Sequence, residues 1–215
     1  MDCVVTNGQV VTADGLKQVD VGIRAGRIAG LGSGLEGARR IDANGCYVFP
    51  GFIDPHVHLQ MRIGENLTGD DFRSGTIAAA CGGTTTIIDF TENCRGDDLE
   101  EWVSRRRGQV DGSATVDYAL HLQLADYSPS TLAHLRRLSE DGYRSAKLYT
   151  TYDGVRLSDR DFLELLDAVR AHGREAGWSR LEVTTPPLPA FERTLAFYER
   201  EGFAVAGGRK LRTPL

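Results

Sequence analysis

The sequence predicts an α/β fold made of three parts: a small N-terminal β-module in residues 1–49, a series of βα units in residues 50–177 and a short β-α-β tail in residues 178–215. Three observations lead to this prediction. Short apolar segments alternate with tight turns in the first part. Strands and helices alternate with a period of about thirty residues in the second part. Prolines then interrupt the pattern before the last helix of the chain.

The N-terminal part reads as short strands joined by tight turns. The turns are marked by Asn7-Gly8, Ala25-Gly26 and Asn44-Gly45, dipeptides that are typical of hairpin connections. The predicted strands are Val4–Thr6, Gln9–Val11, Val19–Arg24 and Arg27–Leu31. Because none of these segments shows a helical period, we predict a small β-module here.

The middle part alternates strands with helices, which indicates a parallel sheet covered by helices. Its strands are apolar and rich in β-branched or aromatic residues, as strands covered on both faces are. The predicted strands are Tyr47–Leu59, Thr84–Phe90, Val116–Leu124 and Ser145–Tyr149. The predicted helices are Asp70–Cys81, Asp98–Val110, Ser130–Glu140 and Asp159–Glu175. Ser158 and Asp161 stand at capping-box spacing and mark the start of the last helix.

The tail predicts a strand, a helix and a strand. They are Leu181–Thr185, Phe191–Glu201 and Phe203–Ala206, with Pro186, Pro187 and Pro189 between the first two.

Composition and charge exclude several classes of protein. With 41% hydrophobic and 26% charged residues, the chain has the composition of a globular protein. The net charge is −5 and basic residues are scattered apart from Arg105, Arg106 and Arg107, so we expect no nucleic-acid partner. No segment approaches the roughly 20 apolar residues of a membrane span, and the N-terminus has no secretory pattern. We therefore expect a cytoplasmic protein without a membrane partner.

Asp54-Pro55-His56-Val57-His58 is the most informative motif, because it lies at the C-terminal end of the first predicted strand of the parallel sheet. Residues two apart on a strand point to the same side, so both imidazoles can face one metal ion. The alternative is a pair of histidines that only make structural hydrogen bonds at a strand end.

Lys147 is the second candidate. The chain has only three lysines among 25 basic residues, yet this one lies inside the apolar strand Ser145–Tyr149. A buried ammonium is costly unless it is paired or changes its charge. A neutral lysine amine can take up carbon dioxide to give a carbamate, an anionic ligand that can bridge two cations. The alternative is a lysine whose amine extends to the end of the strand.

The segments PGFIDPHVHLQ, DDFRSGTIAAACGGTTTIIDF, DYALHLQ and SAKLYTTY occur in this order and closely resemble the hydantoinase and dihydropyrimidinase family of the amidohydrolase superfamily, over residues 1–177. The resemblance implies a TIM-type (β/α) barrel with two metal ions, usually zinc. By the same resemblance, His56 and His58 bind the more buried metal, carboxylated Lys147 bridges both, and Tyr152 hydrogen-bonds the substrate carbonyl or its oxyanion. The loop Leu59–Asp70 would read the ring substituent. Asp89 and His121 also match the family pattern, but we interpret them as structural and not as metal ligands.

The chain departs from that family after residue 177. Complete members supply two more histidines from strands five and six and an aspartate general base from strand eight. Here the position of the fifth strand reads Ser179-Arg180-Leu181-Glu182-Val183, and His134 and His172 lie on predicted helices. Four βα units make about half a barrel, because a whole barrel takes about 250 residues. We therefore expect a partial barrel that holds at most one zinc ion.

The tail resembles a different family. Residues 180–211 are similar to the C-terminal strand, helix and strand of acetyltransferases of the GNAT superfamily, in which a tyrosine matching Tyr198 can protonate the thiolate of coenzyme A. The glycine-rich pyrophosphate loop of that superfamily is absent from the sequence. The alternative is a packing element that covers an exposed sheet edge.

These observations leave three hypotheses for function. The first is a zinc-dependent hydrolase of small cyclic amides, such as dihydropyrimidines or hydantoins, that is weakly active or inactive alone. The second is a catalytically incompetent half-barrel that self-associates as a homo-oligomer through its open strand edges. The third is a remnant of an acetyltransferase.

Overall fold

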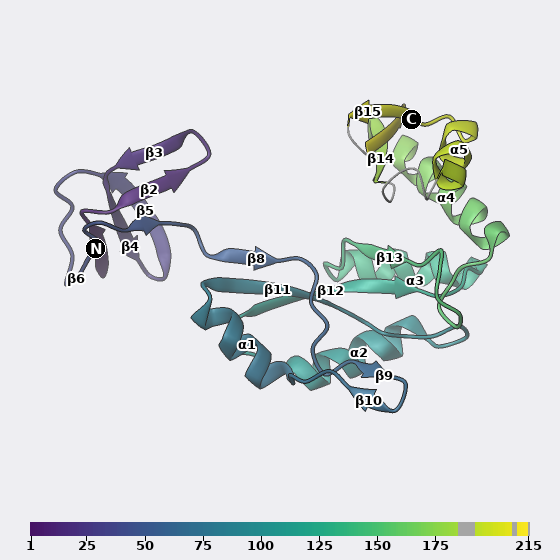
Figure 1. The fold of residues 1–215 in the computed structure, drawn as a ribbon, viewed down its shortest axis with the longest axis horizontal. Coiled ribbons are helices and arrows are strands. Elements are labelled where there is room, and N and C mark those ends of the chain that lie inside the picture. Colours follow the sequence, from purple (N-terminus) through teal and green to yellow (C-terminus); the bar gives the residue numbers. More distant parts are fainter. Residues whose placement is uncertain (185–191, 208–209, 215) are drawn as a thin grey trace. The chain divides into compact units, whose positions relative to one another are not determined.

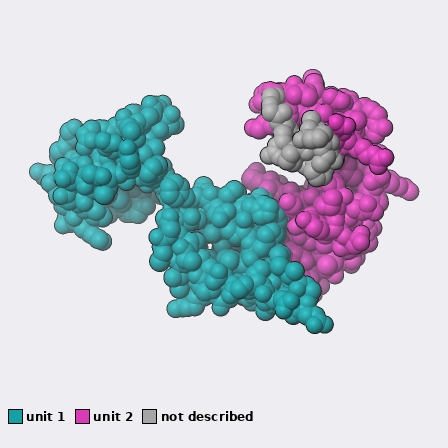
Figure 2. Space-filling model, viewed as in Figure 1, with its two compact units in different colours: residues 1–90, 104–121 teal, residues 91–103, 122–215 magenta. Residues whose placement is uncertain are grey.

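The computed structural model describes residues 1–184, 192–207 and 210–214 (Figure 1). These residues form two compact units: residues 1–90 with 104–121, and residues 91–103 with 122–215 (Figure 2). Within the described residues, no helix is both long and apolar enough to cross a membrane.

The N-terminal module of the first unit contains two small sheets. Strands β1 (Cys3–Thr6), β4 (Asp20–Arg24), β5 (Arg27–Gly32) and β6 (Arg39–Asp42) form one sheet in the order β5-β4-β1-β6. Strands β2 (Gln9–Thr12), β3 (Gly15–Gln18) and β7 (Tyr47–Val48) form the other, in the order β3-β2-β7. Val4, Val10 and Val21 are buried here, so the β-branched residues of the alternating segments supply the core. The four predicted strands are confirmed, whereas β3 and β6, both fully exposed, were not predicted.

The parallel sheet has the strand order β8-β11-β12-β13, which is the order of successive strands in a (β/α) barrel. Its strands are β8 (Phe52–Asp54), β11 (Thr84–Phe90), β12 (Asp117–Leu124) and β13 (Ala146–Leu148). The pairs β8–β11 and β11–β12 lie in the first unit, and β12 continues into the second, where it pairs with β13. The α/β class and the partial barrel predicted from the sequence are confirmed.

The predicted strand Tyr47–Leu59 is in fact divided. Its first two residues form β7 and pair with β2 of the N-terminal module, whereas Phe52–Asp54 form β8 and pair with β11. Pro50 and Gly51 separate the two parts, and a side chain at Gly51 would collide with Thr85.

Helices follow the strands as predicted. They are α1 (Phe72–Cys81), α2 (Leu99–Val110), α3 (Pro129–Glu140) and α4 (Asp159–Glu175). Side-chain caps explain three of the starts: Asp71 caps α1, Ser128 caps α3, and the Ser158 hydroxyl accepts the Asp161 N–H at the start of α4. α1 packs along β11 in the first unit (Figure 1).

The second unit has its own apolar core. It joins one face of β12 to the helices through Leu99, Val103, Leu122, Leu124, Leu138, Leu157 and Leu165. Leucines two apart on β12 point to the same face, which explains why this strand contributes more than one side chain to the core.

The tail forms an antiparallel sheet and does not extend the parallel one. Its elements are β14 (Arg180–Thr184), α5 (Glu192–Arg200), β15 (Ala204–Gly207) and β16 (Lys210–Pro214), with strand order β14-β16-β15. The strand β16 was not predicted. Thr185, Phe191 and the three prolines of the predicted break lie outside the described residues.

Aromatic and ionic contacts pack the tail onto α4. The Phe162 ring of α4 lies 5.7 Å from Phe197 and 6.4 Å from Tyr198 of α5. Arg170 of α4 lies over the ring of Phe203 and pairs with Glu201. The tail is therefore an integral part of the second unit.

Candidate metal centre

His56 and His58 follow directly after β8, at the C-terminal end of the parallel sheet. β8 ends at Asp54. The sequence had placed the two histidines on this strand, whereas they lie just beyond its end. The chain nevertheless stays beside β11, because the Val57 N–H donates to the Ile88 carbonyl at 3.1 Å. The Asp54 carboxylate accepts the His56 N–H at 3.1 Å. These bonds hold the extended conformation that places both imidazoles on the same side.

The two imidazoles meet through their Nε2 atoms, which are 3.2 Å apart. Two imidazole nitrogens on one tetrahedral zinc ion, each at 2.0–2.1 Å, would be about 3.3 Å apart. The distance is that of two nitrogens that share one metal ion, and it is also that of a direct hydrogen bond between the two rings.

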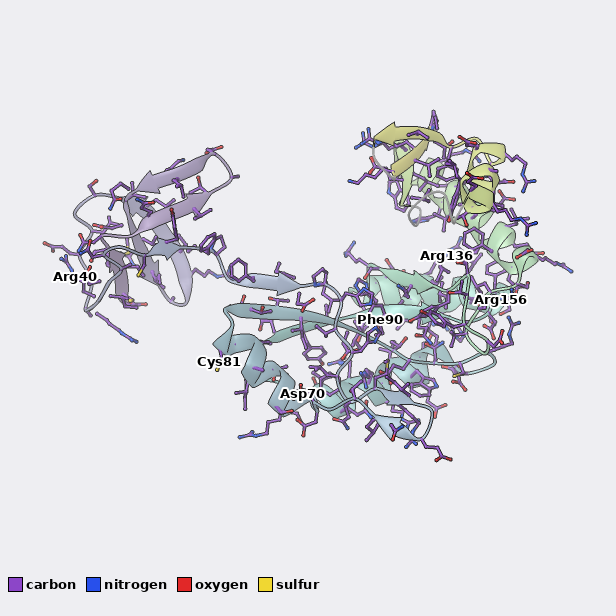
Figure 3. The ribbon with its side chains drawn as sticks, viewed as in Figure 1. Arg40, Asp70, Cys81, Phe90, Arg136 and Arg156 are labelled. Carbon is purple, nitrogen blue, oxygen red and sulfur yellow. The ribbon has the colours of Figure 1, made fainter. Side chains whose placement is uncertain are left out.

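Phe90, the last residue of β11, is labelled in Figure 3, and its ring lies close to both histidines. Its ring centroid lies 4.6 Å from that of His58, in a stacked arrangement, and 4.9 Å from that of His56. The ring of His121 on β12 lies 5.0 Å from Phe90, and its Nε2 is 2.9 Å from the Pro55 carbonyl oxygen. His121 thus helps to fix the backbone before His56.

A buried ion pair supports the same segment. Arg106 of α2 lies 3.1 Å from Asp89 of β11, and both side chains are at most 2% exposed. Arg106 also donates to the Leu59 carbonyl at 2.6 Å, while Asp89 accepts the Leu59 N–H at 3.2 Å. The pair therefore holds both backbone groups of the residue that follows His58.

Asp89 and His58 also offer ligand atoms within 4.8 Å of each other. The Asp89 carboxylate is already bonded to Arg106 through both oxygens, so its main role in the described structure is to position the chain. Sequence analysis treated Asp89 as structural, and it did not identify Arg106, which was noted only as part of a run of three arginines. The sequence signal for Arg106 was its position on an otherwise hydrophobic face of the predicted helix.

Lys147 and Tyr152 lie in the second unit, at the end of β13. Lys147 is half-buried, and its Nζ lies 5.2 Å from the centre of the Tyr149 ring. Burial raises the pKa of the Tyr149 hydroxyl above its usual value, so this ring stays uncharged beside the amine. Lys147 is paired in register with Gln123 of β12.

Tyr152 sits in the turn that follows β13. The Arg156 N–H donates to the Tyr152 carbonyl at 3.0 Å, and the Leu157 N–H donates to the Tyr149 carbonyl at 3.0 Å. The Tyr152 backbone has a φ of 65°, and its side chain is 71% exposed. A tyrosine at positive φ is strained, and such residues are concentrated at functional sites.

The loop Leu59–Asp70 contains a small hairpin, β9 (Arg62–Ile63) and β10 (Asn66–Leu67), that the sequence did not reveal. The Gln60 N–H donates to the Asp70 carbonyl at 2.8 Å and closes the loop at its base. Ile63 and Leu67 are more than half exposed, so the hairpin presents apolar side chains to solvent.

Comparison with protein families and known structures gives a consistent result. The model of the amidohydrolase family matches residues 47–160. A D-hydantoinase from Geobacillus stearothermophilus is 43% identical over 162 residues, which is 74% of this chain and 34% of that enzyme. A D-phenylhydantoinase from Escherichia coli O9:H4 (strain HS) is 38% identical over 180 residues, 80% of this chain and 38% of that enzyme.

A crystal structure of D-hydantoinase superposes with a TM-score of 0.76 at 41% identity, over 80% of this chain and 38% of that one. The D-hydantoinase (dihydropyrimidinase) from Thermus sp. gives a TM-score of 0.75 at 31% identity. The chain spans 34–38% of the length of these curated relatives.

Proposed function

The chain belongs to the amidohydrolase family, and on that premise we propose that it carries the first part of a zinc-dependent site for hydrolysis of the carbon–nitrogen bond of small cyclic amides, such as dihydropyrimidines and hydantoins. The observation that carries the proposal is the His56–His58 pair, whose Nε2 atoms are 3.2 Å apart at the C-terminal end of β8. Chemistry in (β/α) barrels collects at that end of the strands.

His56 and His58 would hold the metal ion, with Lys147 as a further ligand in its carboxylated form. A bound zinc ion would supply Lewis acidity, polarising the ring carbonyl and lowering the pKa of a water molecule. Phe90 would shield one side of the imidazole pair from solvent, which strengthens electrostatic interactions there.

Tyr152 would bind the substrate by donating its phenolic O–H to the ring carbonyl or to the oxyanion that develops from it. Its exposure and its strained backbone support this role, because a packing role would need neither. The exposed apolar residues of the hairpin β9–β10 would read the ring substituent.

For the domains we propose the boundaries 1–49, 50–177 and 178–215, although the described residues pack as two compact units. At the position of a fifth barrel strand, β14 pairs antiparallel with β16. His134 and His172 lie on the helices α3 and α4 and not on barrel strands. We therefore infer that the 215 residues alone hold at most one zinc ion and have little or no hydrolase activity.

Two other hypotheses receive less support. A homo-oligomer would pair the strand edges that β8 and β13 leave open in the sheet.

For an acetyltransferase remnant, Tyr198 would be the acid. Its ring, however, packs against Phe162, Phe197 and Phe203. This burial raises the pKa of the Tyr198 hydroxyl. That environment favours a packing role for the tail.

Metal analysis combined with an activity assay tests the proposal. Purified chain is dialysed against zinc, its bound zinc is counted, its mass is measured by light scattering, and opening of dihydrouracil and of a 5-substituted hydantoin is followed. We expect at most one zinc per chain and little turnover.

The matched variants are His56→Ala and His58→Ala, with His172→Ala as the control, because His172 is exposed on α4 and lies edge-on to Trp178. Loss of zinc in the first two variants and retention in the control support the proposal. Equal zinc binding in all three, or two zinc ions with rapid turnover in the unaltered chain, would contradict it.

A further inference from the structure

A cavity of about 310 Å³ lies within the second unit and includes none of the proposed metal ligands, although its lining residue Gln123 is the register partner of Lys147 on the neighbouring strand. It is open to solvent on one side and is lined by the segment before α2, the end of β12, the loop that follows it and the first turns of α3. Its polar lining includes Asn93, Gln123, Asp97, Asp98, Asp126 and His134. Cavities that bind small molecules start at about 300 Å³, so the space suits a ligand of a few heavy atoms.

A chain of hydrogen bonds fixes the orientation of the Asn93 side chain. The Thr91 hydroxyl accepts the backbone N–H of Gln123 at 2.9 Å, and it donates its own proton to Asn93 Oδ1 at 2.8 Å. These residues are at most 6% exposed. Because Oδ1 is the acceptor for Thr91, the other end of the Asn93 amide must be the Nδ2 donor.

The Gln123 side chain is oriented in the same way. Its Nε2 donates to the backbone carbonyl of Asn93 at 2.5 Å, so Oε1 remains as the acceptor. Within residues 1–184, 192–207 and 210–214, no group bonds to Asn93 Nδ2 or to Gln123 Oε1. Both residues line the cavity and are otherwise buried, so we take this donor and this acceptor as the polar groups that a ligand would meet.

The charge of the lining restricts the kind of ligand. Asp97 and Asp126 accept the backbone N–H groups of Cys94 and Gly96, each at 2.7 Å. Asp98 accepts the Glu101 N–H at 2.9 Å, and this bond is the main reason that the pKa of Asp98 is lowered. Three carboxylates along the cavity repel an anion.

We propose that this cavity binds a small uncharged amide or urea. The carbonyl oxygen of the ligand accepts from Asn93 Nδ2, and an N–H of the ligand donates to Gln123 Oε1. A fixed donor and a fixed acceptor match the two ends of one amide group, and a buried pair left unmatched by a ligand costs free energy. The site shares no residue with the proposed metal centre, although Gln123 lies beside Lys147 on the neighbouring strand.

The test is a nuclear magnetic resonance titration of the full chain, kept metal-free with a chelator, that follows the side-chain amide signals of Asn93 and Gln123. The probe is 2-imidazolidinone, a cyclic urea with one carbonyl and two N–H groups. We expect both signals to shift together, with a dissociation constant on the order of 1 mM, because so few heavy atoms give limited affinity.

Two comparison ligands need no mutation. 1,3-Dimethyl-2-imidazolidinone keeps the carbonyl but has no N–H, and it should bind about tenfold more weakly because it leaves Gln123 Oε1 without a partner. N-carbamoylglycine keeps the urea but adds a carboxylate, and it should bind still more weakly. Equal binding of all three ligands, or shifts elsewhere without those of Asn93 and Gln123, would overturn the proposal.

Asn93→Asp replaces the Nδ2 donor with an oxygen of almost the same shape. It should weaken binding of 2-imidazolidinone about tenfold or more, whereas Asn44→Asp, at an exposed turn of the N-terminal module, should leave it unchanged. Unchanged binding in Asn93→Asp would also overturn the proposal. Should this variant fail to fold, the three ligands on the unaltered chain still decide the question.

Discussion

The ends of β8 and β13 carry the two halves of the predicted ligand set, but the structure supports them very differently. After β8, His56 and His58 are followed by a residue whose N–H and carbonyl are both held by a buried ion pair. After β13, Lys147 is half-buried and Tyr152 is 71% exposed in a turn with a strained backbone. The end of β8 is held in place by a buried ion pair, whereas the end of β13 depends on the geometry of its own turn.

The difference suggests how such a site is built. Metal ligands need fixed geometry, which a buried hydrogen-bond network provides. A residue that must reach a substrate benefits from exposure, and its strain is a cost tolerated for function. Substitution of the ion pair that holds the end of β8 should therefore lower stability strongly, whereas substitution of Tyr152 should raise it.

Arg106→Met should have the largest effect. It leaves the Asp89 carboxylate buried without its partner, which should lower the free energy of unfolding by about 3–5 kcal/mol. Urea unfolding followed by circular dichroism measures the loss. Arg137→Met is the control, because its ion pair with Glu100 is exposed and should contribute about 0–1 kcal/mol. Similar losses in both variants would show that the buried pair does not stabilise this end.

The two histidines could be predicted from the sequence, but the buried ion pair that holds the backbone after them could not. The HxH spacing after an apolar strand is local information, since alternation along an extended chain decides which side chains share a face. The bond between Arg106 and Asp89 joins residues 17 positions apart, and Arg106 stands in a run of three arginines that is typical of a solvated helix face. Only the packing of α2 against the sheet distinguishes it from its neighbours.

The same limit applies to the tail. Its strand and helix periods were readable, so β14, α5 and β15 were largely anticipated. The pairing of β14 with β16 was not, because sequence spacing does not reveal which strand edge a segment will join. Nor could the strain at Tyr152 be predicted, because no glycine or asparagine marks that position as a turn with positive φ.

Tyr152→Gly should raise stability. Glycine adopts a φ of 65° without steric strain, so the free energy of unfolding should rise by about 0.5–1 kcal/mol. Gly154→Ala provides the reverse control, since Gly154 has a φ of 91° and open space around it, and alanine there should destabilise the same turn. Thermal unfolding of both variants measures the effects. A Tyr152→Gly protein that is less stable would show that the tyrosine side chain packs in this turn.

Lys147→Ala should have a smaller effect. The amine lies over the Tyr149 ring, a contact that contributes about 0.5–1 kcal/mol where solvent is near. Urea unfolding in the presence of a chelator measures the loss in the metal-free chain. A loss as large as that of Arg106→Met would indicate that Lys147 belongs to a buried network like that after β8.

Tyr149→Phe should give the smallest change, visible only at alkaline pH. Burial raises the Tyr149 pKa above 10.0, so the unfolded chain loses this proton first and stability falls as pH rises beyond that value. The variant should match the unaltered chain at neutral pH and should lose less stability than it does above pH 10.0. Parallel curves over the whole pH range would contradict the raised pKa.

The most direct test of the His56–His58 centre is nitrogen-15 nuclear magnetic resonance of the imidazoles during a zinc titration. We predict that Nε2 of His56 and Nε2 of His58 shift together and saturate at one zinc ion per chain, while the signals of His134 and His172 stay unchanged. If zinc instead shifts His134 or His172 first, or leaves the β8 pair unaffected at saturation, this pair is not the metal centre of the chain.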